Sequence, residues 1–256
     1  MHKYRTAALW LLFPLIGVLL SSVWFPIAIA NSKKPHAYTY AKLRAVSGIE
    51  LHVLRTKPDN ITLTAISKNV TDTGLYGING GFFFNGDLLS IAVTNDRPAK
   101  GEANDYGTGW YNTDVARGTL IWDEALHAFY IQVVKHAGEL KVTDRNHYWA
   151  QGGVSMKLND DAGWEAQMIA EEMPAYDENR LRSAAAYDNQ GYVWLIVTPT
   201  PCTIEQFRNA ILQKIVPGQL VDGIFLDGDG SSQLASRQDR LTGDGREVYQ
   251  MLQIIK

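Results

Sequence analysis

Alternating hydrophobic and polar positions run through much of the chain after residue 38 and predict a set of β-strands. Residues 61–66 alternate cleanly, with the apolar side chains on one face, and residues 49–54 alternate more loosely. The segment Lys57-Pro58-Asp59-Asn60 between them is typical of a turn. Further strands are expected over 118–122, 129–134 and 224–226, a hairpin over 182–197 with its turn at 188–191, and a closing strand over 247–255.

One segment has helical instead of alternating periodicity. Over residues 203–216 the apolar side chains recur at helical spacing, and Thr203 with Gln206 forms a capping box at the start. A shorter helix is expected over 167–173. Because strands are expected on both sides of the long helix, we predict the α+β class. In detail, we expect a mixed, mostly antiparallel β-sheet with a few flanking helices, in a single domain of the catalytic type.

The first 30 residues have the pattern of a targeting segment. A basic start is followed by an apolar run over 7–20, and Ala28-Ile29-Ala30 fits a small-x-small cleavage site. The stretch 7–30 is also long enough to be an uncleaved membrane anchor, although Pro26 favours cleavage. We therefore predict a signal peptide or N-terminal anchor over 1–30, a folded domain over 38–256, and a secreted, periplasmic or cell-envelope location.

Composition narrows the class of protein. The chain is 46% hydrophobic and 20% charged, which is typical of a globular protein, and its formal net charge of -3 argues against a nucleic-acid partner. The six histidines have no metal-ligand spacing, which argues against a histidine zinc site. The single cysteine, Cys202, excludes an intramolecular disulfide. It could be a nucleophile near a helix start, but we favour a small buried hydrophobe.

The stretch 223–234 places several reactive side chains at the end of an expected strand. The apolar residues 224–226 lead into Asp227-Gly228-Asp229-Gly230-Ser231-Ser232, which packs two carboxylates and two hydroxyls into six residues. The alternative interpretation is a solvated turn, because Asp, Gly and Ser all favour turns.

Three further features are candidates for a site. Asn79-Gly80-Gly81 leads into three phenylalanines and could hold a substrate, or it could be an Asn-Gly turn beside the core. A second glycine pair, Gly152-Gly153, follows an apolar start. Arg182 heads a strand of small residues, where a guanidinium could bind phosphate or form an ion pair at a sheet edge. The long loop 99–112 is typical of a lid or a binding loop.

The order of these segments resembles the phosphodiester glycosidase family of the uncovering-enzyme type. The resemblance rests on the Asn79-Gly80-Gly81-Phe82-Phe83 segment, the Gly152-Gly153 pair, the Arg182-Ser183 strand start and the 226–232 segment, and it covers roughly residues 45–256 as motif order. Two positions depart from the family. Ser183 replaces a threonine and keeps the hydroxyl, whereas Asp229 replaces the middle glycine of a Gly-Gly-Gly run and adds a charge.

The resemblance implies hydrolysis of the bond between the anomeric carbon of a sugar and a phosphodiester oxygen. In this hypothesis Arg182 holds the phosphate, Asp227 is a base or stabilises a cationic transition state, and Asp229 is a second carboxylate or a metal ligand. A divalent cation would be compatible with these oxygen ligands, the sequence does not require one, and no other cofactor is expected. The expected substrate-binding residues are Asn79, Gly80, Gly81, Gly152, Gly153, Ser183, Gly228, Gly230, Ser231 and Ser232.

The sequence leaves two other functions open. One is a non-catalytic exported protein that binds cell-envelope glycans or glycerol-phosphate polymers through the same residues. The other is a structural envelope protein in which the 227–232 stretch is only a turn. In each case we expect no nucleic-acid partner, and contact with a membrane only through an uncleaved N-terminus.

Overall fold

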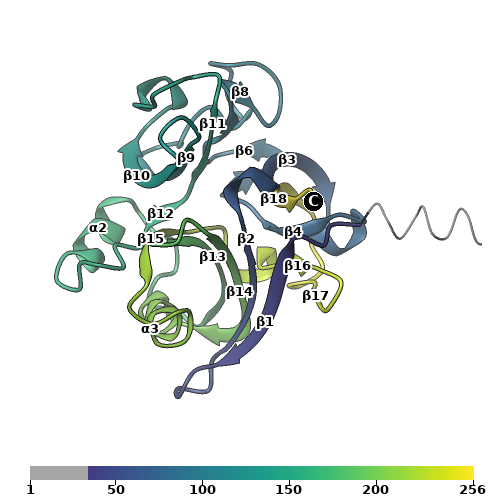
Figure 1. Cartoon of the computed structure of the whole chain (residues 1–256), viewed down its shortest axis with the longest axis vertical. Coiled ribbons are helices and arrows are strands. Elements are labelled where there is room, and N and C mark those ends of the chain that lie inside the picture. Colours follow the sequence, from purple (N-terminus) through teal and green to yellow (C-terminus); the bar gives the residue numbers. More distant parts are fainter. Residues whose placement is uncertain (1–33) are drawn as a thin grey trace, which may run out of the picture. The chain divides into compact units, whose positions relative to one another are not determined.

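Three antiparallel β-sheets make up the fold of residues 34–256, the part of the chain that the computed structural model describes (Figure 1). Residues Ala37–Lys256 form one compact unit. The signal peptide or anchor expected over 1–30 lies outside the described residues. None of the helices in the described part has both the length and the apolar character that a bilayer-spanning helix needs.

The largest sheet has six strands and contains the chain segments on which the candidate site depends. In spatial order its strands are β1 (Tyr38–Arg44), β2 (Glu50–Thr56), β14 (Val193–Cys202), β13 (Arg180–Asp188), β15 (Leu220–Phe225) and β12 (Val154–Ser155). The predicted hairpin over 182–197 is confirmed as β13 and β14, which pair antiparallel.

Two five-stranded sheets and one hairpin complete the β-structure. The second sheet contains β10 (Ala128–Val134), β9 (Arg117–Asp123), β11 (Tyr148–Gly152), β7 (Ala92–Thr94) and β8 (Arg97–Pro98). The third contains β17 (Arg240–Leu241), β16 (Leu234–Ala235), β4 (Tyr76–Asn79), β18 (Val248–Ile254) and β3 (Ile61–Lys68). The hairpin is formed by β5 (Phe83–Phe84) and β6 (Asp87–Leu88). The expected closing strand is confirmed as β18, which pairs with both β3 and β4.

The predicted α+β class is wrong, because the described chain is mainly β. It contains only two α-helices, α2 (Trp164–Ala170) and α3 (Ile204–Lys214), and four short 3-10 turns. The turns are η1 (Pro58–Asn60), η2 (Val70–Asp72), η3 (Ala137–Glu139) and η4 (Asp229–Ser231). The expected strand–helix–strand order exists, but β14 and β15 both pair antiparallel with β13, so the helix crosses over one strand of an antiparallel sheet.

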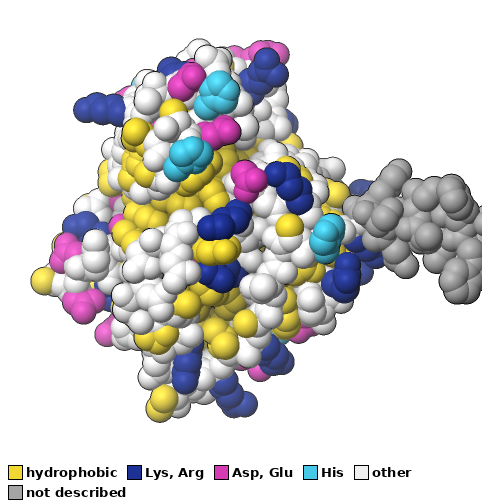
Figure 2. Space-filling view, in the orientation of Figure 1, with side chains coloured by type: hydrophobic (Ala, Val, Ile, Leu, Met, Phe, Trp, Pro, Cys, Tyr) yellow, Lys and Arg dark blue, Asp and Glu magenta, His cyan; other side chains and the backbone are white. Residues whose placement is uncertain are grey.

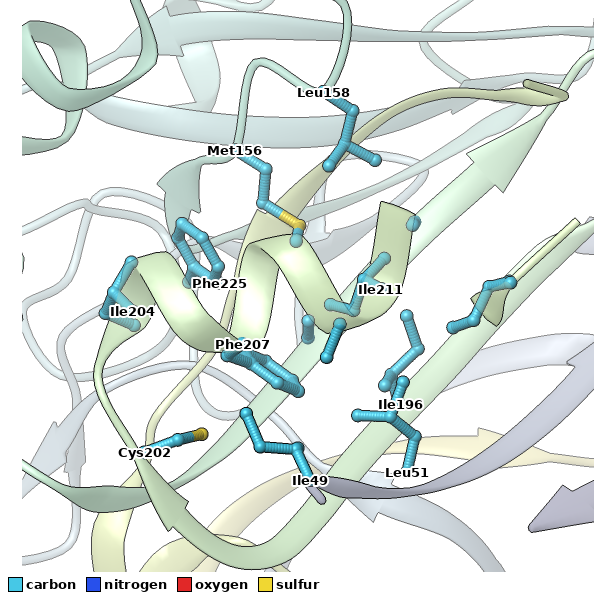
Figure 3. Packing of buried hydrophobic residues seen from close by; sticks show 14 of the residues in the cluster. Ile49, Leu51, Met156, Leu158, Ile196, Cys202, Ile204, Phe207, Ile211 and Phe225 are labelled. Carbon is cyan, nitrogen blue, oxygen red and sulfur yellow. The ribbon is translucent and has the colours of Figure 1, made fainter. Parts of the chain in front are cut away.

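The predicted long helix is confirmed, and its apolar face covers one side of the six-stranded sheet. Thr203 caps it, and the reciprocal hydrogen bonds with Gln206 form the expected capping box. Phe207 and Ile211 are fully buried in a cluster that also contains Cys202 (Figure 3). Burial raises the pKa of the Cys202 thiol to about 11. This cysteine therefore packs as a small hydrophobe and is not an activated nucleophile.

A second hydrophobic cluster fills the space between the sheets. It joins side chains of the six-stranded sheet to side chains of the two five-stranded sheets, among them Leu54, Ile78, Leu120, Leu195 and Leu252. Because each sheet buries one face in this cluster, the strand ends are fixed relative to one another. The candidate site lies at one such set of strand ends.

Candidate functional site

The register between β13 and β15 brings Arg182 next to Asp227. The amide of Leu226 donates to the carbonyl of Ser183 at 2.9 Å and continues the antiparallel ladder beyond the end of β15. One position further along both chains, Arg182 and Asp227 stand opposite each other. The structure thus places these two predicted site residues together at the end of the central sheet.

A cavity of about 220 Å³ opens at this point and combines opposite charges with an apolar wall. Its apolar part comes from Phe82, Met173 and Pro174. Its charged lining is formed by Arg180, Arg182, Asp227, Asp229 and Arg246. Cavities with an apolar wall and a few convergent polar groups are typical of small-molecule sites.

The surroundings of Asp227 tune its acidity. Its amide donates to the carbonyl of Gly80 at 3.2 Å, and its carboxyl accepts a hydrogen bond from the amide of Gly228 at 3.1 Å. Burial raises the pKa of the Asp227 carboxyl to about 6, and hydrogen bonding from Ser231 together with the charge of Arg246 offsets part of that rise. A carboxylate with a pKa near 6 is ionised at neutral pH and can still accept a proton.

Arg182 is a buried cation at the side of the cavity. It is 3% exposed, its Nε donates to the carbonyl of Cys202 at 3.1 Å, and its Nη2 donates to the carbonyls of Ala175 and Glu178 at 2.6 and 2.7 Å. Among residues 34–256 no carboxylate forms an ion pair with it, and its Nη1 has no hydrogen-bond partner. Burial accordingly lowers the pKa of the guanidinium. A buried cation without a counter-charge favours an incoming anion.

Two more arginines stand at the rim, and both are paired and partly exposed. Arg180 lies 2.6 Å from a carboxylate oxygen of Glu178, and Arg246 lies 2.5 Å from one of Asp244. Their charges are therefore largely balanced, unlike that of Arg182. They still add positive potential to the mouth of the cavity.

Asp229 has a backbone conformation that favours glycine. Its φ of 52° lies in the left-handed region, which favours glycine and which aspartate adopts more readily than most residues. Its Oδ2 accepts from Nη1 of Arg180 at 3.2 Å. The added negative charge is thus matched by a rim arginine. Its roles as a second carboxylate or a metal ligand stay predictions.

Asn79 is the centre of the hydrogen bonds behind Asp227. Its Nδ2 donates to the carbonyl of Asp227 at 2.8 Å, and its Oδ1 accepts from the hydroxyl of Ser183 at 2.8 Å and from the amide of Gln233 at 3.0 Å. The residue is 1% exposed. The structure therefore gives Asn79 and Ser183 a positioning role, and direct contact of either with a substrate stays a prediction.

The two glycine pairs, 80–81 and 152–153, do not line the cavity; they allow protein segments to approach one another. A Cβ on the first glycine of the first pair would lie 1.4 Å from Oε1 of Gln250. A Cβ on the second glycine of the other pair would lie 2.2 Å from the carbonyl oxygen of Phe225. Close packing thus explains these glycines without a ligand.

The remaining residues of the 227–232 stretch are divided between the cavity and the interior. Gly228 lines the cavity. A Cβ on Gly230 would lie 2.5 Å from Nε of Arg246, so this glycine makes room for that arginine. Two hydroxyl side chains are buried, Ser231 and Ser232.

The sequence is compatible with a divalent cation at Asp227 and Asp229, but the described residues add no further metal ligands to these two. Within the described residues, no group of three histidine, cysteine, aspartate or glutamate side chains could hold a metal ion. Asp227 and Asp229 would be its only carboxylates, and Asp229 is already paired with Arg180.

Sequence analysis missed several residues that line the cavity. Arg180 precedes Arg182 by two positions, a spacing that could have indicated it. Arg246 lies in a polar loop without a motif, and only the packing of that loop over Gly230 brings it to the cavity. Met173 follows a short helix and carries no sequence signal of its own.

Fold and site together define a mainly-β protein with an aspartate and a buried arginine at one end of its central sheet, where no ion pair neutralises the arginine among residues 34–256. Its fold is similar to that of the zebrafish N-acetylglucosamine-1-phosphodiester alpha-N-acetylglucosaminidase catalytic domain, auto-inhibited by its pro-peptide. The identity is 14%, the TM-score is 0.58, and the match covers 86% of this chain and 82% of that chain. At this identity the likeness shows a common fold.

A second solved structure, of a hypothetical protein from Synechocystis, is more distant. It is 13% identical with a TM-score of 0.43, over 84% of this chain and 61% of that chain. No known protein family and no curated protein matches the sequence.

Proposed function

We propose that this protein is a hydrolase that cleaves a sugar phosphodiester between the anomeric carbon and the phosphate oxygen. The observation that carries the proposal is that one cavity contains both Asp227, with a pKa of about 6, and the buried guanidinium of Arg182, which no described carboxylate pairs with. The fold shared with a phosphodiester glycosidase catalytic domain supports it.

In this proposal the phosphate binds at Arg182. The Nη1 group without a protein partner donates to a phosphate oxygen, and the negative charge compensates the buried guanidinium. Arg246 and Arg180 add positive potential at the rim. The apolar wall at Phe82 and Met173 packs against the less polar face of the sugar ring.

The reaction needs one base and one good leaving group. Asp227, as carboxylate, removes a proton from water while the water oxygen forms a bond to the anomeric carbon. The bond from that carbon to the phosphate oxygen breaks, and its electron pair leaves with the phosphate monoester, held by Arg182. Positive charge that develops on the sugar is stabilised by the negative Asp227. Because a phosphate leaves readily, a second carboxyl that acts as acid is not required.

The proposed setting is outside the cytoplasm. It rests on the targeting pattern of residues 1–30. The substrate class that fits this setting is a cell-envelope or exopolysaccharide-type sugar phosphodiester.

The experiment that tests the proposal measures release of free sugar from a panel of sugar-1-phosphodiesters by the full chain, with and without EDTA. Two variants accompany it, Asp227→Asn and Arg182→Lys, because Arg182→Ala would also leave three backbone carbonyls without a donor. The matched control is Asp105→Asn, an exposed aspartate of the long loop. We expect turnover by the wild type and the control, and loss of turnover in both cavity variants.

A different result would support the binding-protein alternative. If no substrate of the panel is turned over, but a phosphodiester still raises the melting temperature of wild type and not of Arg182→Lys, the cavity binds without catalysis. If no phosphodiester binds at all, the proposal is wrong.

A further inference from the structure

The opposite end of the β13–β14 hairpin carries a second cavity, of about 490 Å³. Three turns from distant parts of the chain form it: residues 57–59 after β2, the turn between β9 and β10, and the turn at 190–191 between β13 and β14. Between the two cavities β13 runs from Arg182 to Asp188, which corresponds to about 20 Å at roughly 3.3 Å per residue. They share no lining residue.

Trp122 is the first sign that this cavity receives a ligand. The residue is only 9% exposed, and its ring packs against Phe129 with the ring centroids 4.8 Å apart. In the described part of the chain its indole N–H has no hydrogen-bond partner, yet it is not among the polar atoms that the protein encloses. The N–H is therefore reachable from outside the protein, and Trp122 lines the cavity. A reachable donor without a partner among the described residues is available to a ligand.

Two more side chains of the same β9–β10 hairpin are available. Glu124 and His127 both line the cavity, both are exposed, and neither side chain forms a hydrogen bond or an ion pair within residues 34–256. Trp122 offers a donor, Glu124 offers acceptors, and a neutral imidazole can act as either. This combination suits a ligand with several hydroxyl groups, each of which donates and accepts.

The opposite wall is held in place before any ligand arrives. The carboxylate of Asp188 accepts from the amides of Gln190 and Tyr192 at 2.9 and 3.0 Å, which fixes the turn between β13 and β14. Lys57 lies 3.5 Å over the ring of Tyr192 and donates to the carbonyl of Gln190 at 3.3 Å. A preformed wall lowers the entropic cost of binding.

The charges of the cavity lining balance one another. Asp59 pairs with Lys256 at 3.0 Å, and among the described residues neither Lys57 nor Glu124 forms an ion pair. One positive and one negative charge therefore remain, so the lining has no excess positive charge that would favour an anion. Figure 2 shows hydrophobic side chains in a hollow over β9 and β10, with histidine, acidic and basic side chains at its margin.

From these observations we infer that this second cavity binds a neutral sugar unit of a glycan. The apolar floor of Trp122 and Pro58 contacts the C–H face of the ring, and the indole N–H, Glu124 and His127 bond to its hydroxyls. The inference does not depend on the proposed hydrolase activity.

Calorimetric titration of the full chain with three neutral hexasaccharides tests the inference: β-1,4-linked glucose, β-1,4-linked N-acetylglucosamine and α-1,4-linked glucose. The decisive variants are Trp122→Phe, which keeps an aromatic ring and deletes the N–H, and His127→Ala at an exposed position. The matched control is Asn146→Ala in another cavity of about 490 Å³, where no aromatic side chain contributes to the lining. Asp227→Asn controls for binding at the first cavity.

We expect at least one hexasaccharide to bind at millimolar concentration or below. The loss of one hydrogen bond in Trp122→Phe should weaken binding about 2- to 10-fold, and His127→Ala should weaken it by a similar factor. Asn146→Ala and Asp227→Asn should bind like wild type. If Trp122→Phe is unfolded by circular dichroism, His127→Ala decides. No binding by any of the three sugars, or unchanged binding in His127→Ala and folded Trp122→Phe, would overturn the inference.

Discussion

The two ends of the β13–β14 hairpin open onto cavities of opposite chemistry. At one end Arg182 is buried without a counter-charge from the described residues, and Asp227 lines the same cavity. At the other end the lining contains Lys57 and Glu124, whose opposite charges balance, and the indole N–H of Trp122 has no partner among the described residues. A buried cation is stabilised by an anion, whereas neutral donors and acceptors are satisfied by hydroxyls. We therefore propose a phosphate site at one end of this sheet and a sugar site at the other.

The largest expected effect is a loss of catalysis, which should arise at the Asp227 cavity alone. Replacing Asp227 by asparagine removes the base but keeps the shape, so kcat on a sugar-1-phosphodiester should fall by about 10³-fold. Binding of a neutral hexasaccharide at the Trp122 cavity should not change. Steady-state kinetics and calorimetry on the same preparation measure both. Turnover within tenfold of wild type would show that Asp227 is not the base.

The pH dependence tests the environment of the same aspartate. Because the pKa of Asp227 is about 6 in the folded protein and about 4 when unfolded, the folded state binds the proton more tightly, and stability falls as pH rises from about 4 to 6. Above that window Asp227→Asn should be more stable than wild type by about 3 kcal/mol, and the difference should vanish near pH 4. Urea unfolding measures it, with Asp105→Asn as control. A constant difference at all pH values would contradict the raised pKa.

The same titration sets the direction of the activity profile. As a base, Asp227 acts in its ionised form, so kcat/KM should rise as pH increases through about 6. A profile that falls through the same range would assign the protonated form, and thus an acid role, to this residue. Hexasaccharide binding should not follow this transition at Asp227.

Arg246 tests the rim of the charged cavity. Its guanidinium is partly exposed and already paired with Asp244, so Arg246→Ala should weaken the binding of inorganic phosphate only about fivefold. The melting temperature should change little, because a surface ion pair contributes little stability. Calorimetry with phosphate measures the effect, and Arg237→Ala is a control at an exposed arginine outside the cavity lining. If wild type and Arg246→Ala bind phosphate with equal affinity, Arg246 does not contribute to the site.

The smallest expected effect concerns Asp229. Because φ is 52°, glycine relieves backbone strain there, while the more flexible unfolded chain and the lost pairing with Arg180 offset the gain. Asp229→Gly should therefore change the free energy of unfolding by less than about 1 kcal/mol, whereas Asp229→Val should destabilise by about 2 kcal/mol. Urea unfolding distinguishes these outcomes. A large loss of stability in the glycine variant would show that the ion pair between Asp229 and Arg180 contributes more to the free energy of unfolding than expected.

The sequence by itself determined the local elements. The strands over 61–66 and 129–134, the hairpin after Arg182 and the capped helix over 203–216 all follow from periodicity and turn chemistry, and the structure confirms them. It also singled out Asp227 and Arg182 as residues of interest, since their chemistry is unusual at strand ends. These features depend on neighbours within a few residues, which is why a sequence reveals them.

Only the tertiary structure decided the class of fold and which side chains lie next to one another. The strand–helix–strand order was compatible with α+β, and long-range antiparallel pairing made the chain mainly β. The pairing register sets Arg182 opposite Asp227, the loop of Arg246 reaches the cavity from far along the chain, and the hairpin of Trp122 meets the turn at 190–191. Such contacts depend on how separate sheets pack around a common core, and no short window of sequence contains that information.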